Sequence, residues 1–230
     1  MEHKRITLFA GHYGSGKTNI AVNYALHLAD EGKKVCIGDL DIVNPYFRTK
    51  DSAKELDAAG VELISPQFAN TNVDLPALPA EAYRLVEDKS IHAIMDIGGD
   101  DRGAYALGRY TPAILAEDNY RMAFVANCYR PLTRTPEDAL EVMREIETAC
   151  GMRFTCIINN SNLGPETTQE TIAASQSFIE KLCEISGLPL WLTTVSQDIA
   201  DGMEHVFPLR LQKKIFDLPP QKPKSRPLWG

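Results

Sequence analysis

A glycine-rich stretch near the start of the chain carries the residue types of a phosphate-binding loop. Residues 8–22 read LFAGHYGSGKTNIAV, which contains the pattern GxxxxGK[ST]. In this pattern glycines let backbone N–H groups turn toward a phosphate, Lys17 reaches the β- and γ-phosphate oxygens, and the Thr18 hydroxyl ligates Mg²⁺. The pattern predicts a nucleoside triphosphate site, whose expected contact residues are Gly11, His12, Tyr13, Gly14, Ser15, Gly16, Lys17, Thr18 and Asn19.

The residues on both sides of the loop favour this interpretation over an ordinary glycine-rich turn. RITLFA, residues 5–10, ends in apolar residues like a buried strand. A helical pattern follows the loop, and we expect the helix to begin near Gly16 and to add its N-terminal dipole to the site. Strand, glycine loop and helix in that order are the context that a phosphate loop requires. The polar stripe of the expected helix consists of Asn19, Asn23, His27 and Asp30.

Two carboxylates follow the second apolar run, in GDLDIVNPYFR. Asp39 and Asp41 are two residues apart, so both lean to the same side of an extended chain. A carboxylate beside a phosphate loop can help hold hydrated Mg²⁺ or orient the water that attacks the γ-phosphate. The alternative is that Asp39 caps the strand and Asp41 caps a turn.

A third carboxylate ends the apolar run IHAIMDI, within IMDIGGDDRG. Asp96 matches the Walker-B position, which holds the metal through water, and Gly99 allows the next loop to approach the γ-phosphate. A plain turn would also use Gly-Gly-Asp, and Arg102 is the nearest cation without an assigned role. The expected metal site is Thr18, Asp39 and Asp96, and the expected catalytic residues are Lys17, Asp39 and Asp41.

Asparagines stand where many phosphate-loop proteins recognise the base, in CIINNSNLG. Asn162 occupies the place of the Asp in the NKxD motif. A carboxylate accepts hydrogen bonds from the paired donors of guanine, whereas an Asn amide donates and accepts at the edge of adenine. We therefore expect ATP, with Asn159 or Asn160 at adenine, while a polar loop without a ligand is the alternative.

Seven apolar, β-rich runs alternate with helical patterns along the chain. This rhythm predicts an α/β fold in three layers, with a parallel sheet of about seven strands and helices on both faces. Right-handed crossovers place the carboxyl ends of all strands, and hence the polar residues above, at one edge of the sheet. The expected strands are 5–10, 34–40, 61–65, 91–97, 121–127, 154–160 and 188–195.

Two helices have explicit start and stop signals. One has Thr135 as N-cap, Pro136 at its first position, Asp138 closing a capping box and Gly151 as its stop. The other is expected from Pro165 to Gly187 by the same logic.

The whole chain is 230 residues long, 44% apolar and carries a net charge of -7. These values predict a single phosphate-loop nucleotide-binding domain over residues 1–218 and argue against an extended nucleic-acid surface. Residues 219–230 are rich in proline and basic residues and are expected to form an extended tail. FPLRLQKKIF, residues 207–216, is expected to pack on the domain, with a membrane-surface segment as the alternative.

The five cysteines are odd in number, widely spaced and without a CxxC pair. They predict reduced thiols in a cytoplasmic protein rather than a zinc or iron–sulfur site. The chain begins with charged residues and has no apolar run of membrane-spanning length, so we expect neither a signal peptide nor a transmembrane helix.

Together the phosphate loop, DLD, DIGGD and the Asn after the sixth run resemble the MinD/ParA branch of the SIMIBI class of P-loop ATPases, grouped with CobQ and CobB relatives, over roughly residues 4 to 200. The resemblance implies ATP, ADP and Mg²⁺ as ligands and a homodimer that forms around ATP and changes its protein partner on hydrolysis. It also implies that Asp41 orients the attacking water.

The loop GHYGSGKT departs from that branch. Its ATP-sandwich members carry a signature Lys just after the first glycine, where this chain has His12 followed by Tyr13. In this respect the loop is closer to the metallochaperone GTPases for hydrogenase and urease, or to dethiobiotin synthetase. Since histidine is only partly protonated at neutral pH, we expect His12 to pack against Tyr13 while another cation, such as Arg102 or an arginine of a partner, supplies the charge. The alternative is that protonated His12 itself acts across an ATP-bound dimer.

Three functions remain open from sequence. The first is an ATP-hydrolysing switch that regulates or assists a protein partner, and the second is an ATP-dependent small-molecule ligase or kinase. In the second, Tyr46 and Arg48, or Arg130 in NCYRP, would grip an acidic substrate. The third is a scaffold that is stabilised by nucleotide without turning it over.

Overall fold

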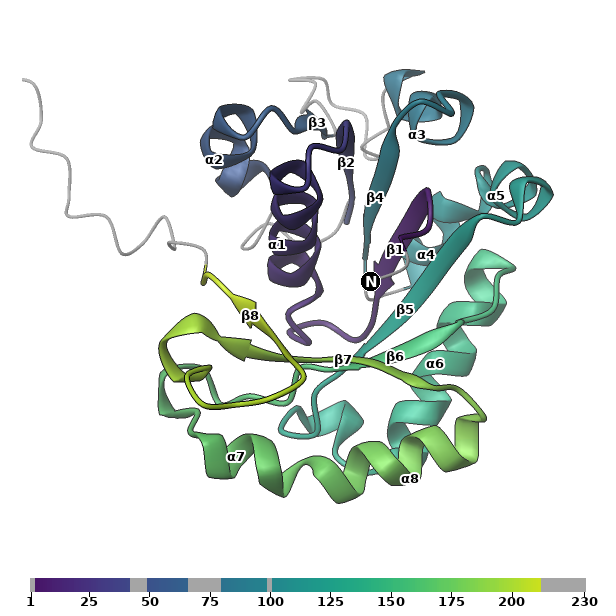
Figure 1. Ribbon diagram of the computed structural model, residues 1–230. Helices are drawn as coiled ribbons and strands as arrows, with labels where there is room; N and C mark the ends of the chain where they lie inside the picture. The colour runs from purple at the N-terminus through teal and green to yellow at the C-terminus, as the bar shows by residue number, and fades with distance from the viewer. Residues whose placement is uncertain (1–2, 42–48, 66–79, 99–100, 212–230) are drawn as a thin grey trace, which may run out of the picture.

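The sheet in the computed structural model has eight parallel strands in the order β3-β2-β4-β1-β5-β6-β7-β8 (Figure 1). The structure describes residues 3–41, 49–65, 80–98 and 101–211. The strands are β1 (Ile6–Ala10), β2 (Val35–Leu40), β3 (Glu62–Ile64), β4 (His92–Ile97), β5 (Tyr120–Ala126), β6 (Cys156–Asn159), β7 (Leu190–Ser196) and β8 (Val206–Leu209). The helices are α1 (Lys17–Asp30), α2 (Ala53–Ala58), α3 (Arg84–Glu87), α4 (Asp101–Gly108), α5 (Thr111–Glu117), α6 (Pro136–Cys150), α7 (Gln169–Ala174) and α8 (Gln176–Ser186).

The central strands are buried on both faces, which explains their continuous apolar runs. Every residue of β1 and β2 is buried, and so is every residue of β4 after His92. All seven strand pairings are parallel, so each strand ends at the same edge of the sheet. The prediction of a parallel α/β fold with about seven strands is confirmed, and the observed sheet has one strand more.

The additional strand, β8, forms one edge of the sheet beside β7. Pro208 is tolerated there because an edge strand leaves its outer N–H positions unpaired. The buried Asn23 side chain fastens the chain just beyond β8, since it donates to Arg210 O at 3.0 Å and accepts from Arg210 N at 2.8 Å. Phe207 and Leu209 are buried, so the start of the 207–216 segment packs on the domain as expected, whereas residues 212–216 and the predicted tail at 219–230 lie outside the described residues. Asn23, which was expected on the polar stripe of α1, is part of this packing.

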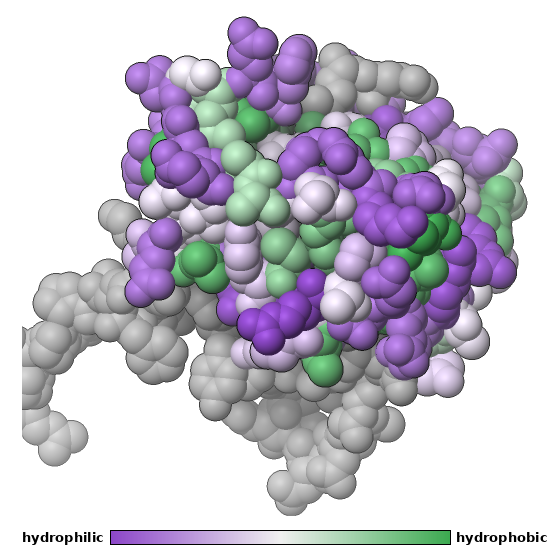
Figure 2. Space-filling model, turned by 90° about the horizontal axis from the view of Figure 1, so that it is seen from below, coloured by the Kyte–Doolittle hydropathy of each residue, from purple (hydrophilic) through white to green (hydrophobic). Residues whose placement is uncertain are grey.

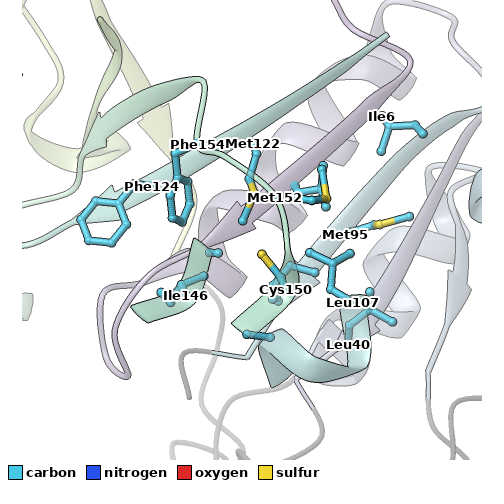
Figure 3. Close-up of a cluster of buried hydrophobic side chains, with 14 of the residues drawn as sticks. Ile6, Leu40, Met95, Leu107, Met122, Phe124, Ile146, Cys150, Met152 and Phe154 are labelled. Carbon is cyan, nitrogen blue, oxygen red and sulfur yellow. The ribbon is translucent and has the colours of Figure 1, made fainter. Parts of the chain in front are cut away.

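Two hydrophobic cores fill the space on either side of the sheet. One core, shown in Figure 3, packs β-strand side chains against α3, α4, α5, α6 and α8, and its aromatic pair Phe124–Phe154 meets edge to face with centroids 5.3 Å apart. The other core packs α1 and α2 against the opposite face, with Phe9, Tyr24 and Trp191 in mutual contact. The helices thus cover both faces, and α1 is fixed against the sheet at the point where it leaves the phosphate loop.

The capping signals of α6 are observed as expected. Thr135 accepts from Asp138 N and the Asp138 side chain accepts from Thr135 N, while Gly151 ends the helix at φ 70°. The helix predicted from Pro165 is different: Pro165 lies in a short 3₁₀ turn, and α7 begins after Thr168, which forms a second capping box with Thr171. Pro165 is a weaker start signal than the Thr168 hydroxyl, which accepts from Thr171 N and so caps the helix.

The surface on the side of α7 and α8, seen from below in Figure 2, is mostly hydrophilic with separate small groups of hydrophobic residues. Exposed ion pairs such as Lys181–Glu184 on α8 belong to this solvated exterior. Within the part of the chain that the structure describes, no helix is both long and apolar enough to cross a membrane.

A buried arginine ties the start of β1 to two helices. Arg5 pairs with Glu117 of α5 and also donates to the carbonyl oxygens of Leu85, Val86 and Asp88. The hydrogen bonds from Arg5 are the main reason that the pKa of Glu117 lies below its usual value of 4.5.

We expect Glu117→Gln to lower the free energy of unfolding by about 1.5–3 kcal/mol at neutral pH, since it removes a charged acceptor from a buried cation. Because the folded-state pKa of Glu117 is depressed, this contribution is present above pH 4.5 and is lost as the pH falls through the folded-state pKa. Urea denaturation of wild type and variant between neutral pH and about pH 3 measures the difference. The exposed Glu81→Gln serves as control, and a difference that stays constant in acid would contradict the assignment.

Candidate functional site

The phosphate loop follows β1 directly and is shaped by two close approaches of backbone and side chain. A side chain at Gly11 would place its Cβ 2.5 Å from Val125 O, and one at Gly16 would place it 2.2 Å from Asn160 Nδ2. Gly16 also has φ 90°, a left-handed conformation that side-chain-bearing residues rarely adopt. The glycines at these two positions are therefore required by the contacts of the loop with β5 and with the end of β6.

Two kinds of polar group at the loop have no protein partner among the described residues. No side chain caps the N-terminus of α1, so its first N–H groups keep the capacity to bind an anion. The Ser15 hydroxyl is buried and has no hydrogen-bond partner among the described residues. A buried hydroxyl without a protein partner next to the start of α1 is suited to hydrogen-bond with a phosphate oxygen.

Lys17 lies inside a cluster of carboxylates. Its Nζ is 2.9 Å from Asp41 Oδ2, and both side chains are only 4% exposed. Asp41 N in turn donates to Asp39 Oδ1 at 3.2 Å. Burial alone would lower the pKa of Lys17, but the carboxylates of Asp96, Asp41 and Asp39 outweigh it and raise the pKa, so the ammonium stays charged. The alternative that Asp39 and Asp41 merely end a strand and a turn does not explain this convergence on Lys17.

Asp96 lies at the centre of this cluster and is completely buried. Burial raises its pKa to about 6, against the opposing effect of Lys17. Its Oδ2 accepts from Thr49 at 3.2 Å, whereas its Oδ1 has no hydrogen-bond partner among the described residues. A buried carboxylate oxygen that faces no donor fits the water shell of Mg²⁺, and Thr18, Asp39 and Asp96 are the residues that would hold the ion.

The two asparagines at the end of β6 form buried side-chain hydrogen bonds, one of which holds the phosphate loop. Asn160 donates to Ser15 O at 2.6 Å and accepts from Thr194 Oγ1 at 2.7 Å. Asn159 donates to Ser175 Oγ at 2.9 Å and accepts from Ser161 N at 3.1 Å. Both amides were expected at the base, and in this structure they are engaged by the protein: they connect the phosphate loop with β7 and with the start of α8.

The loop that was expected to recognise the base is held by its own asparagines. Asn162 donates to Asn160 O at 2.7 Å and accepts from Gly164 N at 3.1 Å, while its backbone N–H donates to Asn127 Oδ1 at 3.3 Å. These contacts bring the chain after β5 and the chain after β6 together at the edge where β1 ends. Base contact by this loop stays a prediction.

A cation contacts the phosphate loop at Gly14. Arg130 donates from Nε to Gly14 O at 2.9 Å, and the arginine comes from the segment after β5. His12 donates from Nδ1 to the neighbouring Tyr13 O at 2.9 Å, and the Tyr13 side chain is 55% exposed. Among the described side chains, Arg130 is thus a cation in direct contact with the loop that lacks the signature Lys.

The structure brings together most of the predicted residues and adds three that the sequence analysis missed or placed elsewhere. Lys17, Thr18, Asp39, Asp41 and Asp96 meet as expected, whereas Gly99 and the loop of Tyr46 and Arg48 lie outside the described residues, as does the side chain of Arg102. The added residues are Thr49, which supports Asp96, Thr194, which supports Asn160, and Arg130. A hydroxyl within the apolar run that forms β7 was the only signal for Thr194.

No protein-family model matches the chain, and neither does any curated protein sequence. Solved structures do match. Cell division protein FtsY from Thermotoga maritima has a TM-score of 0.60 and 16% identity, over 84% of this chain and 62% of that one. Chloroplast FtsY from Physcomitrella patens has a TM-score of 0.56 and 18% identity, over 86% of this chain and 60% of that one. The signal recognition particle 54 kDa protein from Aeropyrum pernix, solved with GDP, has a TM-score of 0.51 and 17% identity, over 82% of this chain and 41% of that one.

The chain spans about three fifths of the length of these FtsY structures, and at such identities the likeness establishes the fold alone. The chain has the parallel α/β fold of the P-loop nucleoside triphosphatases.

Proposed function

We propose that the protein is a Mg²⁺-dependent ATPase of the MinD/ParA type, a switch whose ATP and ADP states differ in their affinity for a protein partner. The observation that carries this proposal is the buried Lys17–Asp41 pair at the start of α1. Two buried oxygens of the same site, Ser15 Oγ and Asp96 Oδ1, have no partner among the described residues. A phosphate and a hydrated metal would satisfy these groups together.

The Lys17–Asp41 contact supplies a physical basis for switching. A triphosphate that draws the Lys17 ammonium to its own oxygens takes it away from Asp41. Asp41 then exchanges its ion pair with Lys17 for a contact with the attacking water. A ligand that has different contacts in two states shifts the equilibrium between them.

The chain's own residues divide the chemistry between them. The α1 N-terminus and the loop N–H groups bind the phosphates, Lys17 neutralises the charge that develops on the transferred group, and Asp41 accepts a hydrogen bond from the attacking water. Mg²⁺, when bound at Thr18, Asp39 and Asp96, adds positive charge to the phosphate oxygens. Arg130 contributes a further cation from outside the loop.

For the base we expect ATP to bind at least about tenfold more tightly than GTP, a difference of ~1.4 kcal/mol, because Asn162 lacks the charged acceptor that pairs with guanine's donors. Calorimetry with the two non-hydrolysable analogues in the presence of Mg²⁺ measures this ratio. Equal affinities, or a preference for the guanine nucleotide, would favour the GTPase alternative. The GDP in the Aeropyrum pernix structure is the observation that keeps this alternative in view.

The competing proposal is an ATP-dependent ligase or kinase of the dethiobiotin-synthetase kind. In that case Arg130 would grip an acidic substrate instead of the nucleotide. Phosphate release from ATP and Mg²⁺ alone supports the switch. Release that occurs only after the small-molecule fraction of a cell extract is added supports the ligase or kinase, and nucleotide binding without release in either assay supports the scaffold.

A homodimer around ATP is part of the proposal. The surface around the Arg130–Gly14 contact carries two exposed apolar residues, Tyr13 at 55% and Leu132 at 59%. Exposed side chains of this kind beside a nucleotide are suited to a contact that forms when the nucleotide binds.

A further inference from the structure

A second group of metal-ligating side chains lies at the far end of α1, away from the phosphate loop. Its members are His3, which precedes β1, His27 in the last turn of α1, and Glu31 directly after the helix. Their ligand atoms all lie within 4.8 Å of one another. At a rise of about 1.5 Å per residue, about 15–20 Å of helix separates His27 and Glu31 from Lys17.

The ligand atoms of the group are close enough together to surround one metal ion. His3 Nε2 is 2.9 Å from Glu31 Oε2, and His27 Nε2 is 3.3 Å from Glu31 Oε1. Ligands that surround Zn²⁺ at about 2.0–2.1 Å in a tetrahedron lie about 3.3 Å from one another. A simple ion pair requires only one imidazole. In this group the Nε2 atoms of two imidazoles face the two carboxylate oxygens of Glu31.

The surroundings of the group also fit a metal. His3 Nδ1 lies 3.1 Å from the Tyr24 hydroxyl, which leaves Nε2 as the ligand atom and fixes the ring. Histidines that bind metals use their second ring nitrogen in this way. Tyr24 and Phe207 provide an aromatic wall, with the Phe207 and His27 rings 5.6 Å apart. The His27 side chain is 39% exposed and that of Glu31 37%, so an ion and a water ligand have access from solvent.

We propose that His3, His27 and Glu31 bind one Zn²⁺ ion, with water as the fourth ligand. Two imidazoles and a carboxylate are a ligand set that Zn²⁺ accepts and that Mg²⁺, which prefers oxygen, does not. The ion fastens the residues before β1 to the end of α1 and so braces the helix that carries Lys17 and Thr18. The site is independent of the proposed nucleotide chemistry, and its test does not require that chemistry.

The first test is a zinc titration of the full chain, purified without a histidine tag and treated with a chelator. A chromogenic chelator reports the competition, and millimolar Mg²⁺ occupies the carboxylates near the phosphate loop. We expect one tight equivalent of Zn²⁺ and a rise of the thermal midpoint by a few degrees.

His27→Ala and Glu31→Gln should each weaken binding at least about tenfold, since even the loss of an outer partner has this effect. His205→Asn, which alters an exposed histidine at φ 57° and keeps a residue that tolerates this conformation, should bind as wild type does.

Two further measurements separate this site from a fortuitous one. Tyr24→Phe keeps the aromatic ring and removes only the hydroxyl at His3 Nδ1, so we expect zinc binding to weaken about 10–100-fold while the ligands stay in place. X-ray absorption at the zinc edge should show nitrogen and oxygen ligands only. Sulfur ligands would assign the zinc to the free cysteines and overturn the proposal, as would unchanged affinity in both ligand variants or the absence of binding at micromolar Zn²⁺.

Discussion

Lys17→Ala is expected to lower the rate of nucleotide hydrolysis at least about 10²–10³-fold, because it removes the cation proposed to stabilise charge on the transferred phosphoryl group. It should also destabilise the protein by about 3–5 kcal/mol, since Asp41 loses a buried partner at 2.9 Å and three carboxylates remain close together without it. Turnover is measured by phosphate release and stability by urea denaturation. A variant with wild-type turnover would remove Lys17 from the proposed role.

The loss of activity has to be separated from the loss of folding. The double variant Lys17→Ala with Asp41→Ala removes both members of the buried pair, so we expect most of the stability to return while hydrolysis stays absent. Asp41→Ala alone should bind ATP with largely unchanged affinity and hydrolyse it slowly, because a positioned water affects rate more than affinity. Full turnover by Asp41→Ala would show that Asp41 does not orient the attacking water.

The second large effect is expected at Arg130. Its guanidinium contacts Gly14 of the loop that has His12 in place of the signature Lys. We expect Arg130→Ala to lower kcat about 10²–10³-fold with little change in KM. This loss of rate is at or below the low end of the loss expected for an arginine that contacts the transferred phosphoryl group. Single-turnover phosphate release and nucleotide titration of the same variant measure the two quantities separately.

Two control variants make this result specific. Arg134→Ala removes an exposed arginine from the same segment and should leave turnover unchanged. His12→Ala should also retain most of the rate, because the hydrogen bond of the His12 side chain goes to the backbone oxygen of its neighbour Tyr13. If His12→Ala lost ATP-dependent dimerisation and activity near pH 6.5, and His12→Lys restored both, His12 rather than Arg130 would be the substitute for the signature Lys.

The fold class and half of the site followed from local patterns. The spacing of Gly11, Gly16 and Lys17 predicted the phosphate loop, because the geometry of such a loop depends on a few consecutive dihedral angles. The parallel sheet followed from buried runs between helical patterns, and the α6 capping box followed from residues three apart. Asp39 and Asp96 were placed correctly because the carboxyl ends of parallel strands share one edge.

The remaining features depend on which strands and helices become neighbours. β4 lies between β1 and β2, so Asp96 and Asp41 approach Lys17 from the ends of two neighbouring strands. This order of strands in the sheet does not follow from the spacing of residues along the chain. Arg130 reaches Gly14 because β5 lies next to β1. His3 meets Glu31 because β1 and α1 pack together, although sequence patterns placed His27 on a solvated stripe.

The sequence by itself determined the position of the phosphate-loop pattern and hence the predicted kind of ligand, since the backbone geometry of such a loop is encoded over eight consecutive residues, from Gly11 to Thr18. Only the tertiary structure decided how the site is charged and supported: which carboxylate holds Lys17, which amide lies under Gly16 and which arginine lies on Gly14. The physical reason is the separation along the chain of the residues on which each feature depends. Loop and cap geometry depends on torsion angles of neighbouring residues, whereas ion pairs and side-chain hydrogen bonds require contact within about 3–4 Å between groups that the whole packed fold must bring together.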